Sequence, residues 1–184
     1  DDNFIHGIKI SRELTINGNG FTLDGSHIAS IFYMEDGYWV TFKDINFING
    51  NATGSADERH GGAISIRRGN CIAENCNFTN NTAKALLAGS YGNMGDGGAI
   101  LWAGINGTVD NCRFIDNVAI HNTTKADSGR GGAVYIESCD HGNKNTTFKN
   151  VYFENNTAGT NGGAIDWTAG AKDGYVGNST FINN

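Results

Sequence analysis

The sequence contains no proline, although glycine is abundant at 27 of 184 residues. Glycine without proline and without a strict three-residue period argues against collagen and against a disordered linker. Positive charge is also scarce, because 13 Lys and Arg stand against 19 Asp and Glu, giving a net charge of −6. The longest basic run is Arg67-Arg68. Nucleic acid and anionic membrane surfaces are therefore not expected as partners.

Long apolar runs are missing as well. No stretch is long enough to span a bilayer, and Asp1-Asp2-Asn3 does not begin a signal peptide. We therefore expect no membrane insertion by this segment. The chain is long enough for a single domain with its own core, although its hydrophobic content of 39% is modest. We interpret residues 1–184 as one domain, either a mature product or a segment of a longer surface protein.

What the sequence does contain is internal repetition. Four copies of a Gly-Gly-Ala-Ile/Val phrase occur, in HGGAISI (60–66), DGGAILW (96–102), RGGAVYI (130–136) and NGGAIDW (161–167). A second phrase lies between them, as NCNFTNNTA (75–83), NCRFIDNVA (111–119), NVYFENNTA (150–158) and NSTFINN (178–184), with a weaker copy DINFINGNA (44–52). Repeats of this length indicate stacked structural units.

Aligned copies show the period-2 pattern of short strands. Phenylalanine recurs in one column of the second phrase, at residues 47, 78, 114, 153 and 181. After Gly-Gly-Ala, two apolar columns flank one that we expect to face solvent, made of Ser65, Leu101, Tyr135 and Asp166. A third strand is expected through 71–74 and 107–110, and no segment has a sustained helical period.

Short strands with one buried face must stack on copies of themselves. The sequence therefore predicts an all-β fold, a right-handed single-stranded parallel β-helix (a solenoid) of about six coils, the last incomplete. Residues 1–52 form the N-terminal coils, and residues 53–184 carry the Gly-Gly-Ala and Phe-x-x-Asn repeats. The Gly-Gly pairs are expected at sharp corners, and an alanine column at a tight bend (residues 52, 83, 119 and 158). No helix or Lys-Ser/Thr follows Gly-Gly, which argues against a phosphate-binding loop.

Two asparagine columns support stacking. One comprises residues 75, 111, 150 and 178, and the other residues 81, 117, 156 and 184. Stacked amides can pair along a ladder, and asparagine tolerates the left-handed backbone of a corner.

The paired phrases Gly-Gly-Ala-Ile/Val and Phe-x-x-Asn resemble the repeat of chlamydial polymorphic outer membrane proteins. The opening LTINGNGFTLDG (14–25), together with the phrases FxNNTA and GGAI, is also similar to adhesin-like surface proteins of methanogenic archaea. The resemblance covers nearly the whole chain and implies a secreted, right-handed β-helix from a cell-surface adhesin. It carries no catalytic residues.

The four cysteines have two interpretations. Cys76 and Cys112 share an inward column in adjacent coils, within disulfide distance. Residues stacked in parallel strands point the same way, however, so we favour buried thiols over a disulfide. Cys71 and Cys139 fall two coils apart and should not meet. No histidine lies at zinc-ligand spacing from these cysteines.

Charged residues are predicted mostly to form ion pairs. One outward column stacks Lys43 on Glu74 and Asp110 on Lys149. In the column before Gly-Gly, Asp96 lies between His60 and Arg130, where a local ion pair is favoured over a catalytic group or Ca²⁺ ligand. No cluster of three acids accompanies a basic residue there, so Ca²⁺ lacks support and no cofactor is expected.

The connections before each Gly-Gly differ in length and should leave one corner together, as loops on a rigid scaffold commonly do where they bind partners. Their candidate contact residues are His60, Leu86, Leu87, Tyr91, Asp96, His121 and Arg130, together with the outward aromatic residue Tyr135. Leu86 and Leu87 could instead cover the edge of a neighbouring coil. Of the eight Asn-x-Ser/Thr sequences, Asn106 and Asn122 are the preferred glycosylation sites, because both are expected in turns or loops.

These observations predict an extracellular, non-enzymatic adhesin or scaffold segment, with a host or microbial cell-surface protein or glycan as partner. The alternative is a β-helix carbohydrate-active enzyme (a polysaccharide lyase or glycoside hydrolase) with its site near Asp96, Asp57 and Arg130. Exposed coil ends could also support end-to-end self-association.

Overall fold

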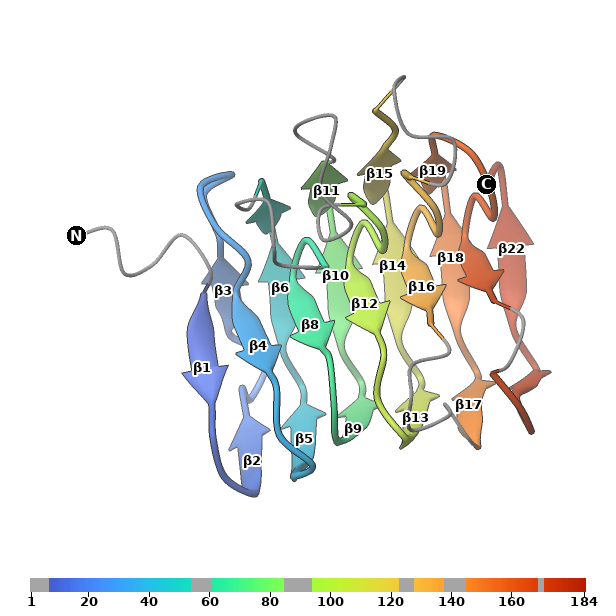
Figure 1. Ribbon diagram of the computed structural model, residues 1–184. Helices are drawn as coiled ribbons and strands as arrows, with labels where there is room; N and C mark the ends of the chain where they lie inside the picture. Colours follow the sequence, from blue (N-terminus) through green and yellow to red (C-terminus); the bar gives the residue numbers. More distant parts are fainter. Residues whose placement is uncertain (1–6, 54–60, 85–93, 123–127, 138–144, 169–170) are drawn as a thin grey trace.

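The computed structural model describes residues 7–53, 61–84, 94–122, 128–137, 145–168 and 171–184, and these ranges contain strands and turns but no helix. Every strand pair is parallel, and each strand pairs with its equivalent in the neighbouring coil or coils. Six coils stack side by side to form an elongated block (Figure 1). Short strands that could not bury an apolar face alone therefore do so by stacking on the equivalent strands of neighbouring coils.

Four sheets run along this stack, and three of them contain six strands. Sheet A is formed by β1 (Ile8–Ile10), β4 (Phe32–Met34), β8 (Ile64–Ile66), β12 (Ile100–Trp102), β16 (Val134–Ile136) and β20 (Ile165–Trp167). Sheet B is formed by β2 (Leu14–Asn17), β5 (Trp39–Lys43), β9 (Asn70–Glu74), β13 (Asn106–Asp110), β17 (Thr146–Lys149) and β21 (Tyr175–Gly177).

Sheet C is formed by β3 (Thr22–Asp24), β6 (Asn46–Ile48), β10 (Asn77–Thr79), β14 (Arg113–Ile115), β18 (Tyr152–Glu154) and β22 (Thr180–Ile182). The smaller sheet D is formed by β7 (Asn51–Ala52), β11 (Thr82–Lys84), β15 (Val118–Ile120) and β19 (Thr157–Ala158). Coils 1 to 6 begin with β1, β4, β8, β12, β16 and β20, respectively.

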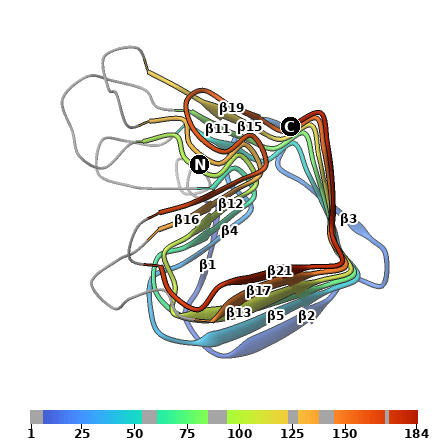
Figure 2. The same cartoon turned by 90° about the vertical axis from the view of Figure 1, so that its right-hand side faces the viewer.

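Figure 2 looks down the stack with the C-terminal coil nearest the viewer. The chain passes counterclockwise through sheets A, B, C and D as it approaches, so the coil is right-handed. The predicted right-handed parallel β-helix of about six coils is confirmed. The predicted alanine column is confirmed, because Ala52, Ala83, Ala119 and Ala158 pair in register, but its placement at a tight bend was wrong, since these residues lie in the strands of sheet D.

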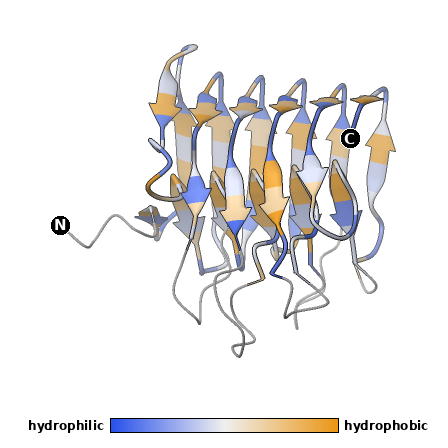
Figure 3. Cartoon of the chain, turned by 90° about the horizontal axis from the view of Figure 1, so that it is seen from above, coloured by the Kyte–Doolittle hydropathy of each residue, from blue (hydrophilic) through white to orange (hydrophobic). Residues whose placement is uncertain are grey.

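The core consists of inward columns of side chains that repeat in every coil. Figure 3 shows the same repetition along the chain, as apolar segments in the strands alternate with polar turns. The phenylalanine column forms a continuous ring stack with centroid separations of 4.8, 4.6, 5.0 and 4.8 Å (residues 47, 78, 114, 153 and 181). In-register parallel pairing imposes this spacing, because equivalent residues are separated by one interstrand distance.

The two glycines of each Gly-Gly pair serve different purposes. The first has a left-handed backbone in the later copies, with φ of 72° at Gly97 and 64° at Gly131. The second lies against the next coil, because a Cβ added at Gly98 would collide with the carbonyl oxygen of Gly132. The predicted glycine corner is confirmed: one residue provides the turn and the other allows close stacking.

The asparagine columns also divide into two types. Asn75, with φ of 54°, and Asn111, with φ of 51°, turn the corner before sheet C, and their exposed amides pair at 2.8 Å. That exposed ladder is interrupted, because Asn150 donates to Asp110 instead. The second column is continuous, with Asn81, Asn117, Asn156 and Asn184 linked at 2.9, 2.9 and 2.7 Å, and it is buried except at the exposed Asn184 of the last coil. Amide ladders are confirmed in both columns.

Candidate functional site

The predicted loop corner lies between sheets D and A. Residues 53–63, 85–99 and 121–133 join β7 to β8, β11 to β12 and β15 to β16, whereas residues 159–164 make the short equivalent between β19 and β20. The strands of sheet D end, and those of sheet A begin, along one corner of the stack (Figure 2). His60, Leu86, Leu87, Tyr91 and Asp57 lie outside the described residues.

Asp96 and Arg130 form a desolvated ion pair at the base of this corner. The carboxylate of Asp96 is 1% exposed, and its Oδ2 accepts from Nη2 of Arg130 at 2.8 Å. Its Oδ1 accepts from the backbone N–H of Arg130 at 2.8 Å. Burial alone would lower the pKa of Arg130, but the hydrogen bond and charge of Asp96 outweigh it and raise that pKa. The predicted ion pair between neighbouring coils is present, and both carboxylate oxygens are engaged.

Tyr135 does not face solvent as predicted. Its side chain is 2% exposed, and the guanidinium of Arg130 lies 4.3 Å from the ring centroid. Leu101 and Ser65, in the same column of sheet A, are also buried. Leu101, Ala103 and Tyr135 form a second apolar cluster outside the main core. The prediction was wrong because alternation along a strand gives the face of the sheet on which a side chain lies, not whether that face is covered.

Asp166 continues this column in the last coil, where it pairs with Tyr135. Burial raises the pKa of Asp166, and the positive charge of Arg130 offsets only part of that rise. A charged and aromatic cluster thus runs from Asp96 through Arg130 and Tyr135 to Asp166. No group of three or more potential metal ligands occurs among the residues that the structure describes.

His121 lies at the base of the 121–133 connection. Its Nδ1 is 3.0 Å from Oγ of the buried Ser128, and that hydroxyl accepts from the backbone N–H of Asn122 at 3.0 Å. The ends of neighbouring connections are also tied together, since Gly129 N donates to Met94 O at 2.8 Å. Thr160 Oγ1 donates to Ser128 O at 2.9 Å. These bonds hold the loop bases at fixed positions.

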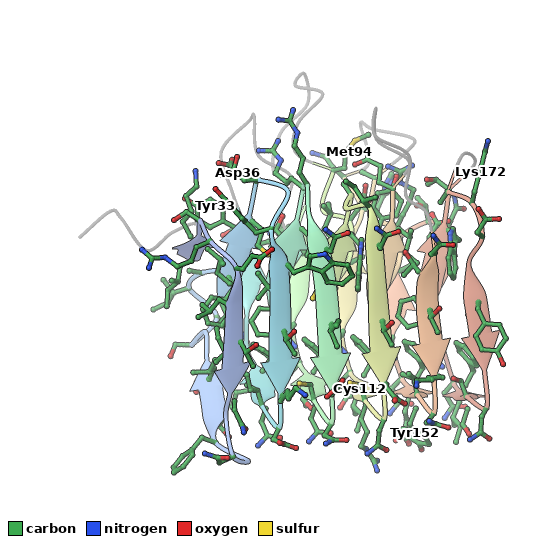
Figure 4. All side chains as sticks on the ribbon, turned by 90° about the horizontal axis from the view of Figure 1, so that it is seen from below. Tyr33, Asp36, Met94, Cys112, Tyr152 and Lys172 are labelled. Atoms are coloured by element: carbon green, nitrogen blue, oxygen red, sulfur yellow. The ribbon has the colours of Figure 1, made fainter. Side chains whose placement is uncertain are left out.

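The outer face of sheet B carries the predicted charge column. Figure 4 views the molecule from this side. Lys43 pairs with Glu74 at 2.8 Å and Lys149 with Asp110 at 3.0 Å, so both predicted ion pairs are confirmed. Hydrogen bonds from Asn150 and Lys149 outweigh the effect of burial and lower the pKa of Asp110.

The two preferred glycosylation sites differ in their surroundings. Asn106 lies in β13, not in a turn or loop as predicted, and its Nδ2 donates to Asn70 at 2.9 Å. It belongs to an amide column along sheet B that the sequence reasoning missed, although Asn70, Asn106 and Asn145 can be aligned. Asn122 is half-buried beside Ser128.

The cysteines within the described residues are thiols, as favoured from the sequence. Cys71, Cys76 and Cys112 are free and buried. The backbone N–H of Cys76 donates to Sγ of Cys112 at 3.3 Å, which confirms their stacking in adjacent coils. Burial raises the pKa of Cys71 far above its ordinary value. Cys139 lies outside the described residues.

Comparison with known proteins supports the repeat. The Chlamydia polymorphic membrane protein repeat matches residues 150–166, which contain one Phe-x-x-Asn phrase and the Gly-Gly-Ala-Ile phrase that follows it. Neither the curated proteins nor the solved structures gave a match. The described ranges contain no helix long and apolar enough to cross a membrane. The chain therefore carries a repeat similar to that of a family of chlamydial membrane proteins, on a parallel β-helix.

Proposed function

We propose that this chain is a non-enzymatic segment of a cell-surface adhesin or scaffold. It binds a host or microbial surface protein or glycan through the corner between sheets D and A. The observation that carries the proposal is that connections of unequal length leave one corner of an otherwise uniform stack. An extracellular or surface location agrees with the repeat, which is that of a membrane protein family.

The loop bases support this role because they are fixed in place. The buried Asp96–Arg130 pair joins two coils directly beside the Gly-Gly corners, and Ser128 joins the ends of two connections. Loops that start from such rigid points lose less conformational entropy when they bind a partner. Variation in loop length then changes recognition while the coils remain the same.

A carbohydrate-active enzyme, the alternative from the sequence, draws no specific support. Asp96 is 1% exposed and its two oxygens are bonded to Arg130, so a substrate would have to break this pair to reach the carboxylate. Burial raises the pKa of Asp166, but the charge that acts on it is that of Arg130, not the second carboxylate that glycoside hydrolysis requires. We therefore propose the binding role.

The test replaces one long loop by the sequence of the short connection found elsewhere in the same chain. Residues 85–93 are replaced by Gly-Thr, as at residues 159–160, and the protein is coupled to beads. Adherence of the beads is measured on animal, bacterial and archaeal cells and on mucin. The control reverses the Lys43–Glu74 pair on sheet B, far from the loops.

The unmodified protein and the sheet B control should adhere to at least one of these surfaces, and the shortened variant should adhere much less with an unchanged circular dichroism spectrum. Equal adherence by the shortened variant would contradict the loop corner as the binding surface. Failure of the unmodified protein on every surface would contradict the adhesin role.

A further inference from the structure

The outer face of sheet B presents a straight column that is mostly threonine and is interrupted by Ile72 in coil 3. In-register pairing aligns Thr15, Thr41, Ile72, Thr108 and Thr147 along the stack, and Tyr175 occupies this column in coil 6. Their spacing is that of neighbouring strands, roughly 4.8 Å. Within the described part of the chain, the hydroxyls of Thr41, Thr108 and Thr147 have no hydrogen-bond partner and face solvent. They are available to a ligand.

An aromatic platform lies at one edge of this face. Trp39 is 43% exposed and precedes Thr41 on the same side of β5, and its neighbour Tyr38 is 37% exposed. Among the aromatic side chains that the structure describes in coils 2 to 5, these two are exposed and the others are buried or half-buried. Trp39 pairs with Asn70 of the next coil, whose Nδ2 donates to no described residue. Asn70 is itself 7% exposed, so the accessible group that adjoins the threonine column here is the indole face of Trp39.

The charges on this face are already neutralised. The strands β5, β9, β13 and β17 contain four charged residues, and these form the Lys43–Glu74 and Asp110–Lys149 pairs. A strongly anionic ligand would gain no unpaired cation here. A large protein partner is also disfavoured, because stable protein interfaces have an extensive apolar centre, and this face offers only the separated side chains of Trp39, Ile72 and Tyr175.

We propose that the outer face of sheet B binds a neutral, extended polysaccharide of the β-1,4-linked type, aligned with the stack. A sugar ring stacks on Trp39, and the hydroxyls of Thr41 and Thr108 bond to hydroxyls along the chain. Rings with equatorial substituents present the flat face that an indole requires, and a straight polymer can follow a straight column. This surface lies apart from the loop corner and does not depend on it (Figure 2), since sheet B is at the opposite side of the coil from sheet D.

The experiment measures retention of the whole chain on chitin, cellulose and β-mannan, with polygalacturonate as the charged comparison. Soluble hexasaccharides of the same three polymers are titrated while tryptophan fluorescence is recorded with acrylamide as quencher. Trp39 is the most exposed of the three tryptophans, since Trp102 is fully buried and Trp167 is half-buried. A bound sugar should therefore protect the fluorescence from acrylamide.

We expect retention on at least one of the three neutral polymers and weak retention on polygalacturonate. Trp39→Ala should weaken binding by about tenfold, the effect of losing one aromatic stacking contact. Thr108→Arg should block the column and abolish retention. Tyr152→Ala, which removes an aromatic ring from sheet C, serves as the matched control and should bind as the unmodified protein does.

Absence of retention on all three neutral polymers would overturn the proposal, as would equal affinity of the Trp39→Ala variant or preferential binding of polygalacturonate. The variant with shortened residues 85–93 separates the two proposals. It should keep polysaccharide binding if sheet B is the site, whatever its effect on adherence to cells.

Discussion

The buried amide ladder makes a strong prediction about stability. Asn117 is fully buried, and its side chain makes four hydrogen bonds. Its Oδ1 accepts from the backbone N–H and the amide of Asn81 at 3.1 and 2.9 Å. Its Nδ2 donates to Phe78 O at 3.0 Å and to Asn156 Oδ1 at 2.9 Å. Asn117→Ala removes all four bonds without exposing the site to water.

The magnitude follows from what is left without a partner. Asn156 Oδ1 keeps a second donor, the backbone N–H of Asn117, at 3.1 Å. The backbone N–H and the side-chain amide of Asn81 lose their acceptor, and the carbonyl of Phe78 loses its donor. Each buried group left unsatisfied costs about 1–3 kcal/mol, so these three groups should together cost about 3–9 kcal/mol. That is a large part of the roughly 5–15 kcal/mol by which a folded domain is stable.

Urea unfolding followed by circular dichroism measures the change in the free energy of unfolding, and thermal melting should show a fall of about 10 °C or more. The matched control is Asn111→Gly in the exposed ladder. Glycine keeps the left-handed backbone of that corner and water replaces the lost bond, so the expected cost is below about 1 kcal/mol. Equal effects of the two substitutions would refute the reasoning, because burial would then not determine how much an amide pair contributes to the free energy of unfolding.

Three further results are expected. Gly98→Ala should destabilise the fold by about 3 kcal/mol or more in thermal melts, since its Cβ would strike a carbonyl of the next coil, whereas Gly37→Ala meets no atom within 4 Å and should be nearly neutral. In a glycosylating host, glycopeptide mass spectrometry should find more glycan on Asn155, which is exposed and donates its amide to no described residue, than on Asn106; the reverse would contradict a role for the ladders in site choice. Cys71 should react with a maleimide at pH 8 only after denaturation, because burial raises its pKa and excludes the reagent; rapid labelling of the folded protein would contradict this.

The parts of the fold that could be predicted from the sequence are those set by residues that recur at the same position in every coil. The phenylalanine column recurs with every repeat, so stacking of Phe78 on Phe114 followed directly from the alignment of the copies. The Lys43–Glu74 pair was predictable for the same reason, because neighbouring coils place opposite charges at one position. Parallel in-register pairing turns a sequence column into a line of contacts.

What the sequence could not show depends on contacts between different columns. Leu101 and Tyr135 alternate correctly with the inward residues, yet both are buried on the outer face of sheet A. Their apolar character was the available signal, but burial there requires groups from elsewhere, such as the guanidinium of Arg130. The strands of sheet D were also missed, because Thr82–Lys84 and its equivalents contain too few residues for a period to be recognised.

The buried asparagines connect the architecture with the proposed binding corner. Asn81 and Asn117 directly precede β11 and β15, and the variable connections begin where those strands end. A shift of one residue in the pairing of these strands would place an amide against apolar side chains and leave its bonds unmade. The ladder therefore penalises any other register at the point where loop length varies most. Loops of different length can be accommodated there because the coil beneath them has only one low-energy alignment, which keeps their bases in a single line.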